Sequence, residues 1–590
     1  MTVAPAKWWK HATVYQIYPA SFKDSNNDGW GDLAGIVEKL PYLKHLGVDA
    51  VWLCPFYDSP QEDMGYDIAD YEKVWPRYGT NQDCFELIRQ CHALDIKVVV
   101  DLVINHCSSE HAWFRESRAS RTNAKRDWFM WRPARGRDPQ GRPIPPNNWR
   151  SIFGGPAWEW DEATQEFYLH LFAKGQPDFN FENAELRKQL YETAAGFWLR
   201  HGVDGFRIDT AGLYSKKPGL PDAPITEPGS EFQYAGELMR NGPRIHEFHK
   251  EMRRYFLSQV PDGKQIFTVG EVGHCEDESL LLYTSAEQQE MDQLFTFAHT
   301  DIGAASGSRY QIEPFSLKEW KLAVADSFLF ANRTDSWSTV YLENHDQPRS
   351  VTRFGDDSPR WRQVSAKLLA LLEVSLTGTL YVYQGQELGQ INNLDWSLDQ
   401  YRDIEVVTHA NEIREKFGED SAQMHKFKHA AALISRDHSR NPFPWSAREP
   451  DAGFSDHGNE PAATPWMDPN SSYREGINAE DQLSDPNSVL NFWRRALQVR
   501  KANLDLLAYG QDFEFYQLDH PSLFMYTKQP RDGSAQSRRL FAALNFSSQA
   551  CEFTKPDPRA SYQQFFANYP TEDAEPNILR PWEGRLFFMD

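Results

Sequence analysis

Three carboxylates that follow short apolar segments are the residues best placed to do chemistry in this chain. They are Asp209 in DGFRIDTAG, Glu271 in FTVGEVGH and Asp346 in LENHDQPRS. Short apolar runs bounded by polar residues are typical of buried strands. When parallel strands close into a barrel, the residues at their C-terminal ends meet at one mouth, so carboxylates far apart in sequence can act together. A pair of carboxyl groups that meet in this way can cleave a glycosidic bond.

A barrel of parallel strands is therefore the element that must position these carboxylates. Helical patterns separate most of the apolar segments, as in 81–95, where a polar start precedes apolar residues near helical spacing. The segment 185–202 has a similar pattern and ends at Gly202, a good helix terminator. Strands that alternate with helices indicate a parallel sheet, and eight such units predict an α/β fold of the (β/α)8 TIM barrel type. The predicted strands lie in 12–22, 48–56, 97–106, 205–212, 266–272, 293–299, 339–346 and 379–389.

A resemblance to a known family follows from these motifs. Together with DLVINH at 101–106, the three carboxylate motifs resemble the four signature regions of glycoside hydrolase family 13, the α-amylase family, in the same order. Matches at QIYPASF, DMGYDI and SRDHSRNPFPW extend the resemblance over essentially the whole chain. Within that family the chain most resembles fungal maltases and isomaltases and bacterial oligo-1,6-glucosidases. The resemblance implies a retaining α-glucosidase that needs no organic cofactor.

The remaining segments complete the predicted domain organisation. Residues 108–183, rich in Pro, Gly and Arg, are too many for an ordinary loop, and the resemblance makes them an inserted domain after the third strand that walls one side of the pocket. An irregular, acidic stretch at about 391–485 follows the eighth strand, and short alternating segments from 513 onward indicate an antiparallel β-sandwich. We therefore divide the chain into barrel parts at 1–107 and 184–512, the inserted domain at 108–183 and a C-terminal sandwich at 513–590.

The resemblance also implies a role for each carboxylate. Asp209 is expected to be the nucleophile, Glu271 the general acid and base, and Asp346 the stabiliser of the transition state. Arg207 lies two residues before Asp209 on the same face of the strand, so its charge is expected to keep Asp209 ionised. Glu271 follows an apolar run, where loss of water favours the protonated acid. Asp101 is expected to orient Arg207 rather than to contact sugar, and for any one carboxylate alone a strand cap or salt bridge is the simpler explanation.

Other residues are expected to surround the bound sugar. Tyr66 is expected to stack on the terminal sugar, while Asp63 and Arg436 close the inner end of the pocket, so that cleavage occurs at the non-reducing end. His106 and His345 are suited to hydrogen-bond sugar hydroxyls. A buried tyrosine, structural histidines and a surface ion pair are the alternative explanations. By the same resemblance, the inserted domain contributes pocket walls at Phe153, Phe172 and Gln176.

Two residues beside the carboxylates bear on the linkage that is cleaved. Thr210 follows Asp209, as in DTAG of the maltose-cleaving relatives, whereas α-1,6-specific relatives typically have Val there. Thr and Val have nearly the same shape, but only Thr can hydrogen-bond a second sugar. Gly273 is small where isomaltose-specific fungal relatives have Gln. We therefore predict preference for maltose, sucrose and short α-1,4-glucosides, with some transglycosylation; the alternative is that Thr210 only packs.

Three other functions remain to be distinguished. An isomaltase or oligo-1,6-glucosidase would share the whole catalytic apparatus. A sucrose isomerase would have an arginine-rich RLDRD-type loop after the fourth region, but residues 347–357 read QPRSVTRFGDD. A non-catalytic scaffold of the kind found in amino-acid transporters would have a membrane helix and an incomplete catalytic set. This sequence has all three carboxylates and no run of the roughly 20 apolar residues that cross a bilayer.

An oxygen-rich segment near the N-terminus is a candidate metal loop. DSNNDGWGD begins like an EF-hand, with Gly29 at the sixth position, but the twelfth position is Gly35 rather than a bidentate Glu, which excludes an EF-hand. The resemblance to oligo-1,6-glucosidases implies structural Ca²⁺ at this loop, and a solvated acidic turn is the alternative. The expected ligands are the side chains of Asp24, Asn26, Asp28 and Asp32 and the backbone carbonyl of Trp30.

The amino-acid composition limits the classes of molecule that this protein is expected to bind. A formal net charge of -22 argues against nucleic acid and anionic membranes, because both attract cationic surfaces, and leaves neutral oligosaccharides as partners. The first residues lack the pattern of a signal peptide, so we expect a cytoplasmic protein, as a monomer or weak homo-oligomer. The six cysteines are scattered without a CxxC pair, which favours reduced thiols.

Overall fold

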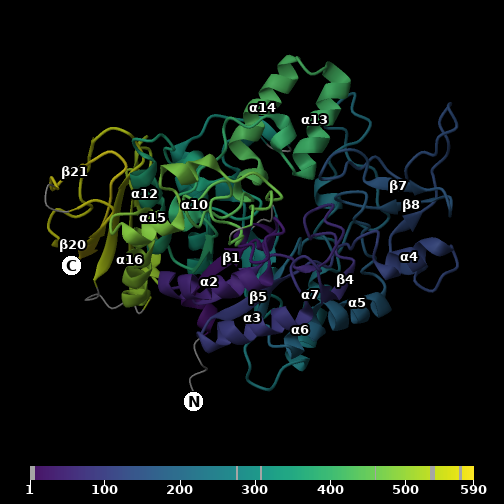
Figure 1. Ribbon diagram of the computed structural model, residues 1–590, viewed down its shortest axis with the longest axis horizontal. Coiled ribbons are helices and arrows are strands. Elements are labelled where there is room, and N and C mark those ends of the chain that lie inside the picture. The colour runs from purple at the N-terminus through teal and green to yellow at the C-terminus, as the bar shows by residue number, and fades with distance from the viewer. Residues whose placement is uncertain (1–6, 274–276, 306–307, 459, 532–537, 571–573) are drawn as a thin grey trace.

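Eight parallel strands form the central sheet, which nearly closes into a barrel (Figure 1). The computed structural model describes residues 7–273, 277–305, 308–458, 460–531, 538–570 and 574–590. The strand order is β11-β10-β9-β5-β2-β1-β15-β14, and Thr339 Oγ1 donates to the carbonyl of Leu294 at 3.0 Å, which joins the two outer strands. The predicted TIM barrel is therefore confirmed. The strands are β1 (Thr13–Ile17), β2 (Ala50–Leu53), β5 (Lys97–Leu102), β9 (Gly205–Ile208), β10 (Phe267–Glu271), β11 (Gln293–Phe295), β14 (Thr339–Val340) and β15 (Thr379–Tyr383).

Helices with local start and stop signals surround this sheet. In α3 (Asn81–Ala93), Thr80 and Asp83 form a capping box, and the apolar face is buried. The segment before β9 is helical as predicted, but it contains a wider π-helical turn, Tyr191–Gly196, between α5 (Ala184–Leu190) and α6 (Phe197–Arg200). Other helices of this layer are α2 (Leu33–Leu46), α7 (Ile245–Ser258), α10 (Leu317–Arg333), α12 (Arg362–Ser375) and α16 (Val489–Ala502).

The segment between β5 and α5 forms a small lobe of its own. It contains α4 (Ala112–Ala119) and an antiparallel sheet of order β6-β8-β7. Its core includes Trp149 and Trp158, which cluster with Leu213 and Met239 from the segment after β9. The lobe is thus packed against a loop that leaves the carboxyl end of a barrel strand. The three strands are β6 (Trp131–Arg132), β7 (Trp158–Asp161) and β8 (Glu166–Leu169).

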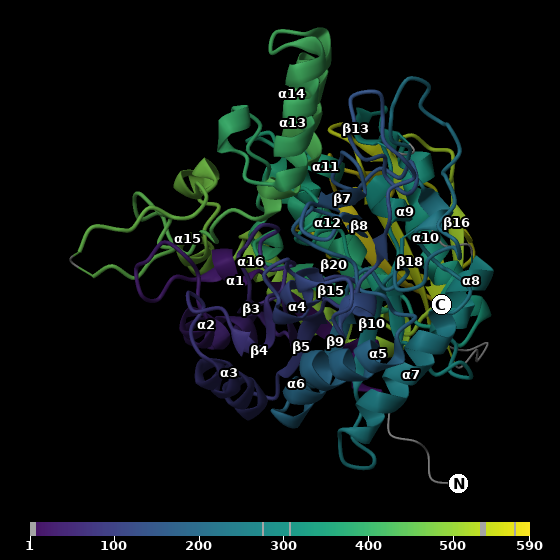
Figure 2. The ribbon, with the colours of Figure 1, turned by 90° about the vertical axis from the view of Figure 1, so that its right-hand side faces the viewer.

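The stretch at 391–485 is less irregular than its composition indicated. It contains two helices, α13 (Ile404–Phe417) and α14 (Ala422–Ile434), which form a hairpin that projects from the barrel (Figure 2). Val406 and Ala410 of α13 pack with Met424 and Phe427 of α14. The apolar face of α13 is narrow and most of its other positions are polar, which explains why periodicity alone did not reveal it. The short helix α15 (Ala479–Ser484) follows.

The C-terminal segment forms the predicted antiparallel sandwich. A five-stranded sheet has the order β16-β17-β18-β22-β20, and a two-stranded sheet pairs β19 with β21. Phe541 and Phe587 of the larger sheet cluster with Phe553 and Leu579, so that the smaller sheet covers one of its faces. The strands are β16 (Gln511–Tyr516), β17 (Leu523–Gln529), β18 (Arg539–Asn545), β19 (Cys551–Glu552), β20 (Tyr562–Ala567), β21 (Ile578–Leu579) and β22 (Gly584–Met589).

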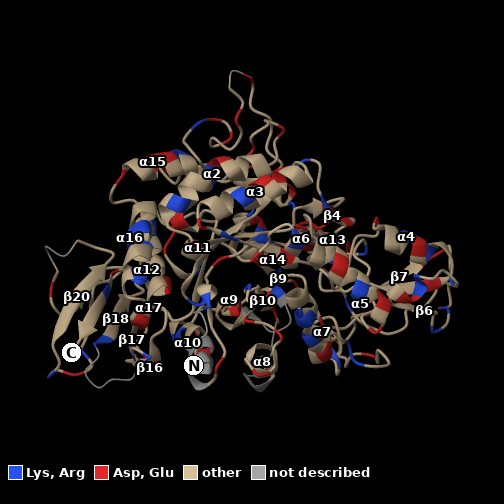
Figure 3. Cartoon of the chain, turned by 90° about the horizontal axis from the view of Figure 1, so that it is seen from below, with Lys and Arg blue, Asp and Glu red and all other residues tan. Residues whose placement is uncertain are grey.

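Acidic and basic residues are interspersed along the outer helices, where red and blue segments of the cartoon lie near one another (Figure 3). Among the described residues, no helix has the length and apolar character that a membrane crossing requires. The cysteines in the described ranges are free thiols, of which all but Cys551 are buried. Cys275 lies outside the described residues.

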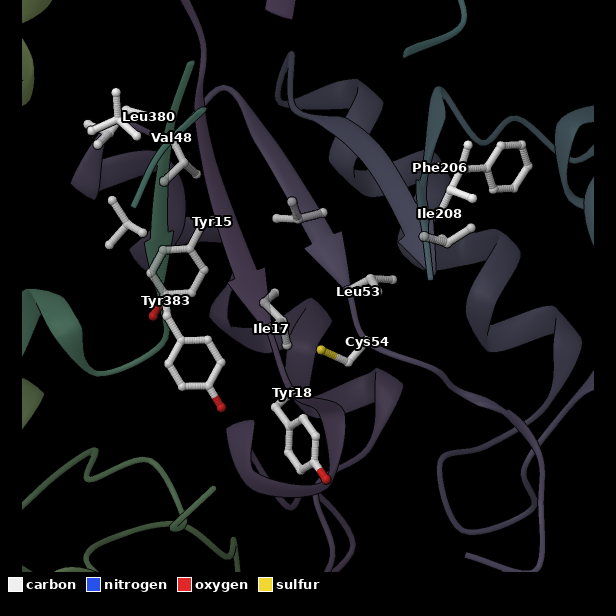
Figure 4. Close-up of a cluster of buried hydrophobic side chains, with 14 of the residues drawn as sticks. Tyr15, Ile17, Tyr18, Val48, Leu53, Cys54, Phe206, Ile208, Leu380 and Tyr383 are labelled. Carbon is white, nitrogen blue, oxygen red and sulfur yellow. The ribbon is translucent and has the colours of Figure 1, made fainter. Parts of the chain in front are cut away.

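The core lies on both faces of the central sheet. Val14 and Trp52 belong to the cluster inside the barrel, whereas their neighbours Tyr15 and Leu53 belong to the cluster beneath the helices. Figure 4 shows part of this outer cluster, including Tyr15, Leu53 and Ile208 from three strands. Because both faces of the sheet are buried, the strands are almost continuously apolar, and they could therefore be predicted from the sequence.

Candidate active site

The three carboxylates lie at carboxyl ends of barrel strands. Asp209 directly follows β9, Glu271 is the last residue of β10, and Asp346 lies in the segment after β14. Asp209 is buried, while the side chains of Glu271 and Asp346 keep 20% and 26% of their surface exposed. Parallel strands direct their carboxyl ends to the same side of the barrel, and ion pairs with arginines hold the carboxylates there.

One guanidinium holds two of the carboxylates together. Arg207 Nη1 donates to Asp209 Oδ1 at 2.6 Å, and Nη2 donates to Glu271 Oε2 at 2.7 Å. Nη1 also donates to Asp101 Oδ1 at 2.6 Å. Asp101 is held in turn by Trp52 Nε1 at 3.0 Å and the Tyr66 hydroxyl at 3.2 Å. Asp101 therefore orients Arg207, which aligns Asp209 with Glu271.

Burial dominates the protonation of this pair. Loss of water raises the pKa of Asp209 to about 7 although Arg207 opposes the rise, and the pKa of Glu271 is raised to about 7 for the same reason. The sequence predicted that Arg207 would keep Asp209 ionised, but desolvation and the nearby carboxylates outweigh its charge. Two carboxyls that share one cation ionise as a coupled pair. Near neutral pH the pair can hold one proton, with one acid and one carboxylate.

Asp346 is in a different electrostatic environment. Arg436 Nη1 and Arg440 Nη2 donate to its Oδ1 at 3.0 and 2.8 Å, and His345 Nε2 lies 3.2 Å from its Oδ2. Burial opposes ionisation, yet these neighbours hold the pKa of Asp346 well below its usual range. Because burial lowers the pKa of His345 to about 3, the ring is neutral and the two arginines provide the charge. Asp346 therefore stays ionised while the other pair shares a proton.

A buried ion cluster lies beside Asp346. Arg436 Nη2 donates to Asp63 Oδ1 at 3.1 Å, and Arg436 makes a two-pronged contact with Asp403, at 2.8 Å for each hydrogen bond. Asp403 and Arg440 were not among the site residues expected from the sequence. No local signal identifies Asp403, which caps α13 within the acidic stretch; Arg440 is part of the quoted SRDHSRNPFPW motif and could have been considered.

The aromatic and histidine side chains form a connected network. Tyr66 stacks on His345 with ring centres 5.2 Å apart and planes 5° apart. Gln16 Nε2 donates to His345 Nδ1 at 2.8 Å, which leaves Nε2 to donate to the Tyr66 hydroxyl at 2.6 Å. Both ring nitrogens of His345 thus have protein partners, through which the ring orients Tyr66 and Asp346. The expected hydrogen bond from His345 to sugar stays a prediction. His106 Nε2 lies 3.1 Å from the carbonyl of Tyr66.

The lobe at 108–183 contributes side chains to the same place. Gln176 Nε2 donates to Asp63 Oδ2 at 3.2 Å, and the Arg436 guanidinium lies 5.0 Å from the ring centre of Phe153. Phe172 lies 5.4 Å from Phe153 and 5.0 Å from the ring of His106. The three residues predicted as pocket walls are therefore brought to the ion cluster of Asp63 and Arg436.

Thr210 and Gly273 lie beside the paired carboxylates. The Thr210 amide donates to Glu271 Oε2 at 3.1 Å and its hydroxyl to Asp209 Oδ2 at 3.2 Å. Its φ of 42° is in the left-handed region, which is strained for a β-branched residue and is found most often at functional sites. A Cβ at Gly273 would have only ordinary contacts, 3.5 Å from Arg240 Nη1 and 3.8 Å from Phe297. A Cβ would therefore fit at Gly273 without a clash, and the glycine itself presents no side chain near Glu271.

In the candidate metal loop, the aspartate side chains accept hydrogen bonds from backbone amides of the loop itself. Asp24 Oδ1 accepts a hydrogen bond from the Asn27 amide at 2.7 Å, and Asp32 Oδ2 accepts one from the Ser25 amide at 2.9 Å. Burial raises the pKa of Asp28 and Asp32, and the charge of Asp24 adds to the rise. Within the described ranges, no three side chains of the His, Cys, Asp and Glu types are grouped as a metal site. The donor set, which also includes Asn26 and the Trp30 carbonyl, is all oxygen and fits a hard cation in its chemistry.

Comparison with known proteins places this geometry among carbohydrate-active enzymes. Residues 16–510 match the family described as "Alpha amylase, catalytic domain". The chain is 60% identical to an oligo-1,6-glucosidase of Saccharomyces cerevisiae, over 99% of each chain. It is 57% identical to an α-glucosidase of the same yeast, over 99% of this chain and 98% of that one. The crystal structure of isomaltulose synthase from Erwinia rhapontici matches with a TM-score of 0.90 and 36% identity over 100% of both chains.

Proposed function

The chain belongs to the α-amylase family of glycoside hydrolases, and we propose that it is a retaining, exo-acting α-glucosidase of the maltase type. Its substrates are maltose, sucrose and short α-1,4-glucosides, from which it releases glucose at the non-reducing end. The single observation that carries the proposal is the pairing of Asp209 and Glu271 on the two nitrogens of Arg207. A nucleophile and a proton donor must be held together in this way for cleavage with retention.

In the proposed mechanism, ionised Asp209 attacks the anomeric carbon while protonated Glu271 gives its proton to the departing glycosidic oxygen. A covalent glucosyl ester on Asp209 results. Glu271, now ionised, takes a proton from water, whose oxygen attacks the anomeric carbon and releases Asp209. Two inversions at the same carbon yield α-glucose. A sugar hydroxyl in place of water gives the transglycosylation product.

The ion cluster around Arg436 supports cleavage at the chain end. Arg436 is fixed by Asp403 and also contacts Asp63 and Asp346. In the proposed complex, Asp63 and Arg436 hydrogen-bond the far hydroxyls of the terminal glucose, and Tyr66 and His106 lie beside it. An oligosaccharide that continued beyond this glucose would meet buried ion pairs of the protein, and displacing these ion pairs is unfavourable.

The preference between maltose and isomaltose as substrates is argued from Thr210 and Gly273, the two residues beside the paired carboxylates. Overall identity favours neither, because the oligo-1,6-glucosidase and the α-glucosidase relatives differ by only 3 points, 60% against 57%. Thr210 has a hydroxyl that reaches Asp209 and can also hydrogen-bond a second sugar, and Gly273 presents no side chain two residues after Glu271. These features support the maltase type over the isomaltase type.

The specificity is tested with purified protein and a Thr210→Val variant. For the wild type we expect kcat/KM to be about ten-fold or more higher for maltose and sucrose than for isomaltose. Val keeps the β-branched shape at this φ but removes the hydroxyl, so Thr210→Val is expected to lower the maltose-to-isomaltose ratio by about three- to ten-fold. Thr210→Ser, which keeps a hydroxyl, is the matched control and should retain most of the preference.

Several outcomes would contradict this assignment. An unchanged ratio in Thr210→Val removes the role of Thr210, and absence of hydrolysis of both maltose and sucrose removes the substrate class. Formation of isomaltulose from sucrose would indicate an isomerase instead. Proton NMR of the first-formed anomer tests retention directly, because a retaining enzyme releases α-glucose before mutarotation.

We also propose that the loop of Asp24, Asn26, Asp28, Trp30 and Asp32 binds Ca²⁺ as a structural ion. Burial is the main cause of the raised pKa of Asp28 and Asp32, and the charge of Asp24 adds to it; a bound cation would favour the ionised form of both carboxyls. Because a ligand that binds only the folded state stabilises it, chelator is expected to lower the melting temperature and added Ca²⁺ to restore it. Asp28→Asn keeps an acceptor for the Trp30 amide but removes a charge, and should abolish both shifts. A wild-type melting temperature unaffected by chelator and by Ca²⁺ contradicts the site.

A further inference from the structure

A short turn at 435–440 carries both arginines that pair with Asp346. Arg436 and Arg440 donate to Asp346 Oδ1 at 3.0 and 2.8 Å, and Arg436 also donates to Asp63 Oδ1 at 3.1 Å. Most of the turn is a 3₁₀-helix, whose internal hydrogen bonds have poorer geometry than those of an α-helix. The positions of the two guanidinium groups therefore depend on the side chains that hold the turn in place.

Arg349 holds the turn from the side of the barrel. Its Nε donates to the carbonyl of His438 at 3.3 Å, and its Nη2 donates to the carbonyl of Ser439 at 3.2 Å. Its Nη1 donates to the carbonyl of Gln384 at 2.8 Å and to Glu343 Oε2 at 3.1 Å. Gln384 directly follows β15, and Glu343 lies in the segment after β14. One guanidinium thus connects the turn to the carboxyl ends of two barrel strands.

Asp403 holds the same turn from the side of the α13 and α14 hairpin. Its carboxylate accepts hydrogen bonds from Arg436 Nε and Nη2, each at 2.8 Å, and caps α13 by accepting one from the Glu405 amide at 3.1 Å. Asp437 of the turn accepts a hydrogen bond from the Asp403 amide at 3.0 Å. Although burial opposes ionisation, the charge of Arg436 lowers the pKa of Asp403 below its ordinary value. The turn and the start of α13 are thus locked together from both sides.

The contact with Asp403 determines which donors Arg436 offers to the pocket. Asp403 occupies Nε and one side of Nη2, which leaves Nη1 and the other side of Nη2 for Asp346 and Asp63. A two-pronged contact fixes the plane of a guanidinium as well as its position. The side chains of Arg349 and Asp403 are only 1% and 0% exposed, so neither can touch a sugar and both act through the turn.

We infer that Arg349 and Asp403 are positioning residues for recognition of the chain end. They hold the turn so that Arg436 is directed at the 4-hydroxyl of the terminal glucose before the substrate binds. The inference rests on the proposed exo-acting function, in which Asp63 and Arg436 hydrogen-bond the far hydroxyls. The 4-hydroxyl lies across the ring from the anomeric carbon and is free only in the last unit of an α-1,4-linked chain. A donor that is already in place avoids the free-energy cost of ordering it on binding.

The test compares kcat/KM for p-nitrophenyl α-glucoside and for its 4-deoxy analogue, which lacks only this hydroxyl. The wild type is expected to prefer the parent substrate by about 100-fold or more, because the analogue leaves charged groups without a partner. Arg349→Lys keeps the charge but cannot span several carbonyls. Asp403→Asn keeps a good helix cap but loses the ion pair. Each variant is expected to reduce the preference by about five- to ten-fold, because a displaced Arg436 bonds the 4-hydroxyl less well.

This preference distinguishes positioning from folding. Both substrates are measured on the same preparation, so a smaller fraction of folded enzyme cancels from the ratio. Arg500→Lys is the matched control for Arg349→Lys: Arg500 is equally buried and donates to backbone carbonyls, but one of these belongs to Gly378, which precedes β15 at the opposite end of the barrel. Ser421→Ala removes the cap of α14 and is the control for a loosened hairpin. Both controls should keep the wild-type preference.

Calorimetric titration with glucose and 4-deoxyglucose gives a readout that needs no turnover. Glucose should bind the wild type more tightly, and Arg349→Lys and Asp403→Asn should narrow the difference. A wild type that does not distinguish the two substrates, variants that keep the wild-type preference, or controls that lose it to the same degree would overturn the inference. Absence of any α-glucoside hydrolysis would instead contradict the proposed function, and the titration alone would then support or overturn the positioning role.

Discussion

Asp209→Asn is expected to lower kcat for maltose by about 10⁴-fold or more, the scale seen when a catalytic nucleophile is removed. The amide has nearly the shape of the carboxylate but cannot attack the anomeric carbon. Its oxygen can still accept a hydrogen bond from Arg207, which also keeps its contacts with Asp101 and Glu271. The variant should therefore fold normally, and initial rates with maltose and an aryl α-glucoside measure the loss.

The control for this experiment separates chemistry from folding. Asp222→Asn removes an exposed carboxylate that pairs with Arg135, and it should keep full activity. Circular dichroism and the melting temperature of Asp209→Asn should stay close to the wild type. If Asp209→Asn kept more than a few per cent of the wild-type rate, the assignment of the nucleophile would be wrong.

Glu271→Gln is expected to show a loss that depends on the leaving group. Hydrolysis of maltose should fall by about 10³-fold or more, because the departing sugar needs a proton. A dinitrophenyl α-glucoside needs no such help, so its cleavage to the glucosyl intermediate should be much less impaired. Added azide should restore turnover and yield the α-glucosyl azide, since it attacks the intermediate without a general base. Equal losses for both substrates, with no azide rescue, would show that Glu271 is not the acid and base.

The same variant tests the origin of the pH profile. The raised pKa of Glu271, about 7, predicts that kcat/KM of the wild type falls as pH rises through about 7, because the acid loses its proton. Activity should also fall at low pH as Asp209 becomes protonated. Asp346 should not contribute, since its pKa is held well below the usual range. With the dinitrophenyl substrate, which needs no proton from Glu271, the alkaline limb of kcat/KM should be absent in both the wild type and Glu271→Gln.

Much of the fold could be predicted because its signals are local. The eight strands are short apolar runs that parallel burial on both faces makes conspicuous, and the helix of α3 has its own capping box. The α13 and α14 hairpin was missed for the opposite reason. Its apolar contacts, such as Val406 with Phe427, form only when the two helices meet, and most other positions are polar.

The residues of the candidate site likewise fall into those with a local sequence signal and those without one. Asp209, Glu271 and Asp346 could be found because each lies at or after the end of a strand within a recognisable motif. Asp403 could not, since nothing near it in the sequence indicates that it pairs with Arg436. The protein partners of His345 could not be predicted either, because Gln16 and Tyr66 contact its ring nitrogens and no local pattern reveals such contacts.

The amino-acid sequence was sufficient for the kinds of group at the site and for the barrel that carries them, because both depend on residue type and on periodicity along the chain. The protonation of Asp209 and Glu271 and the fixed position of Arg436 required the folded structure. These properties arise from burial and from distances between residues far apart in sequence. Arg207 and Asp209 illustrate the difference: adjacency on a strand indicated an ionised carboxylate, but removal of water raised its pKa to about 7.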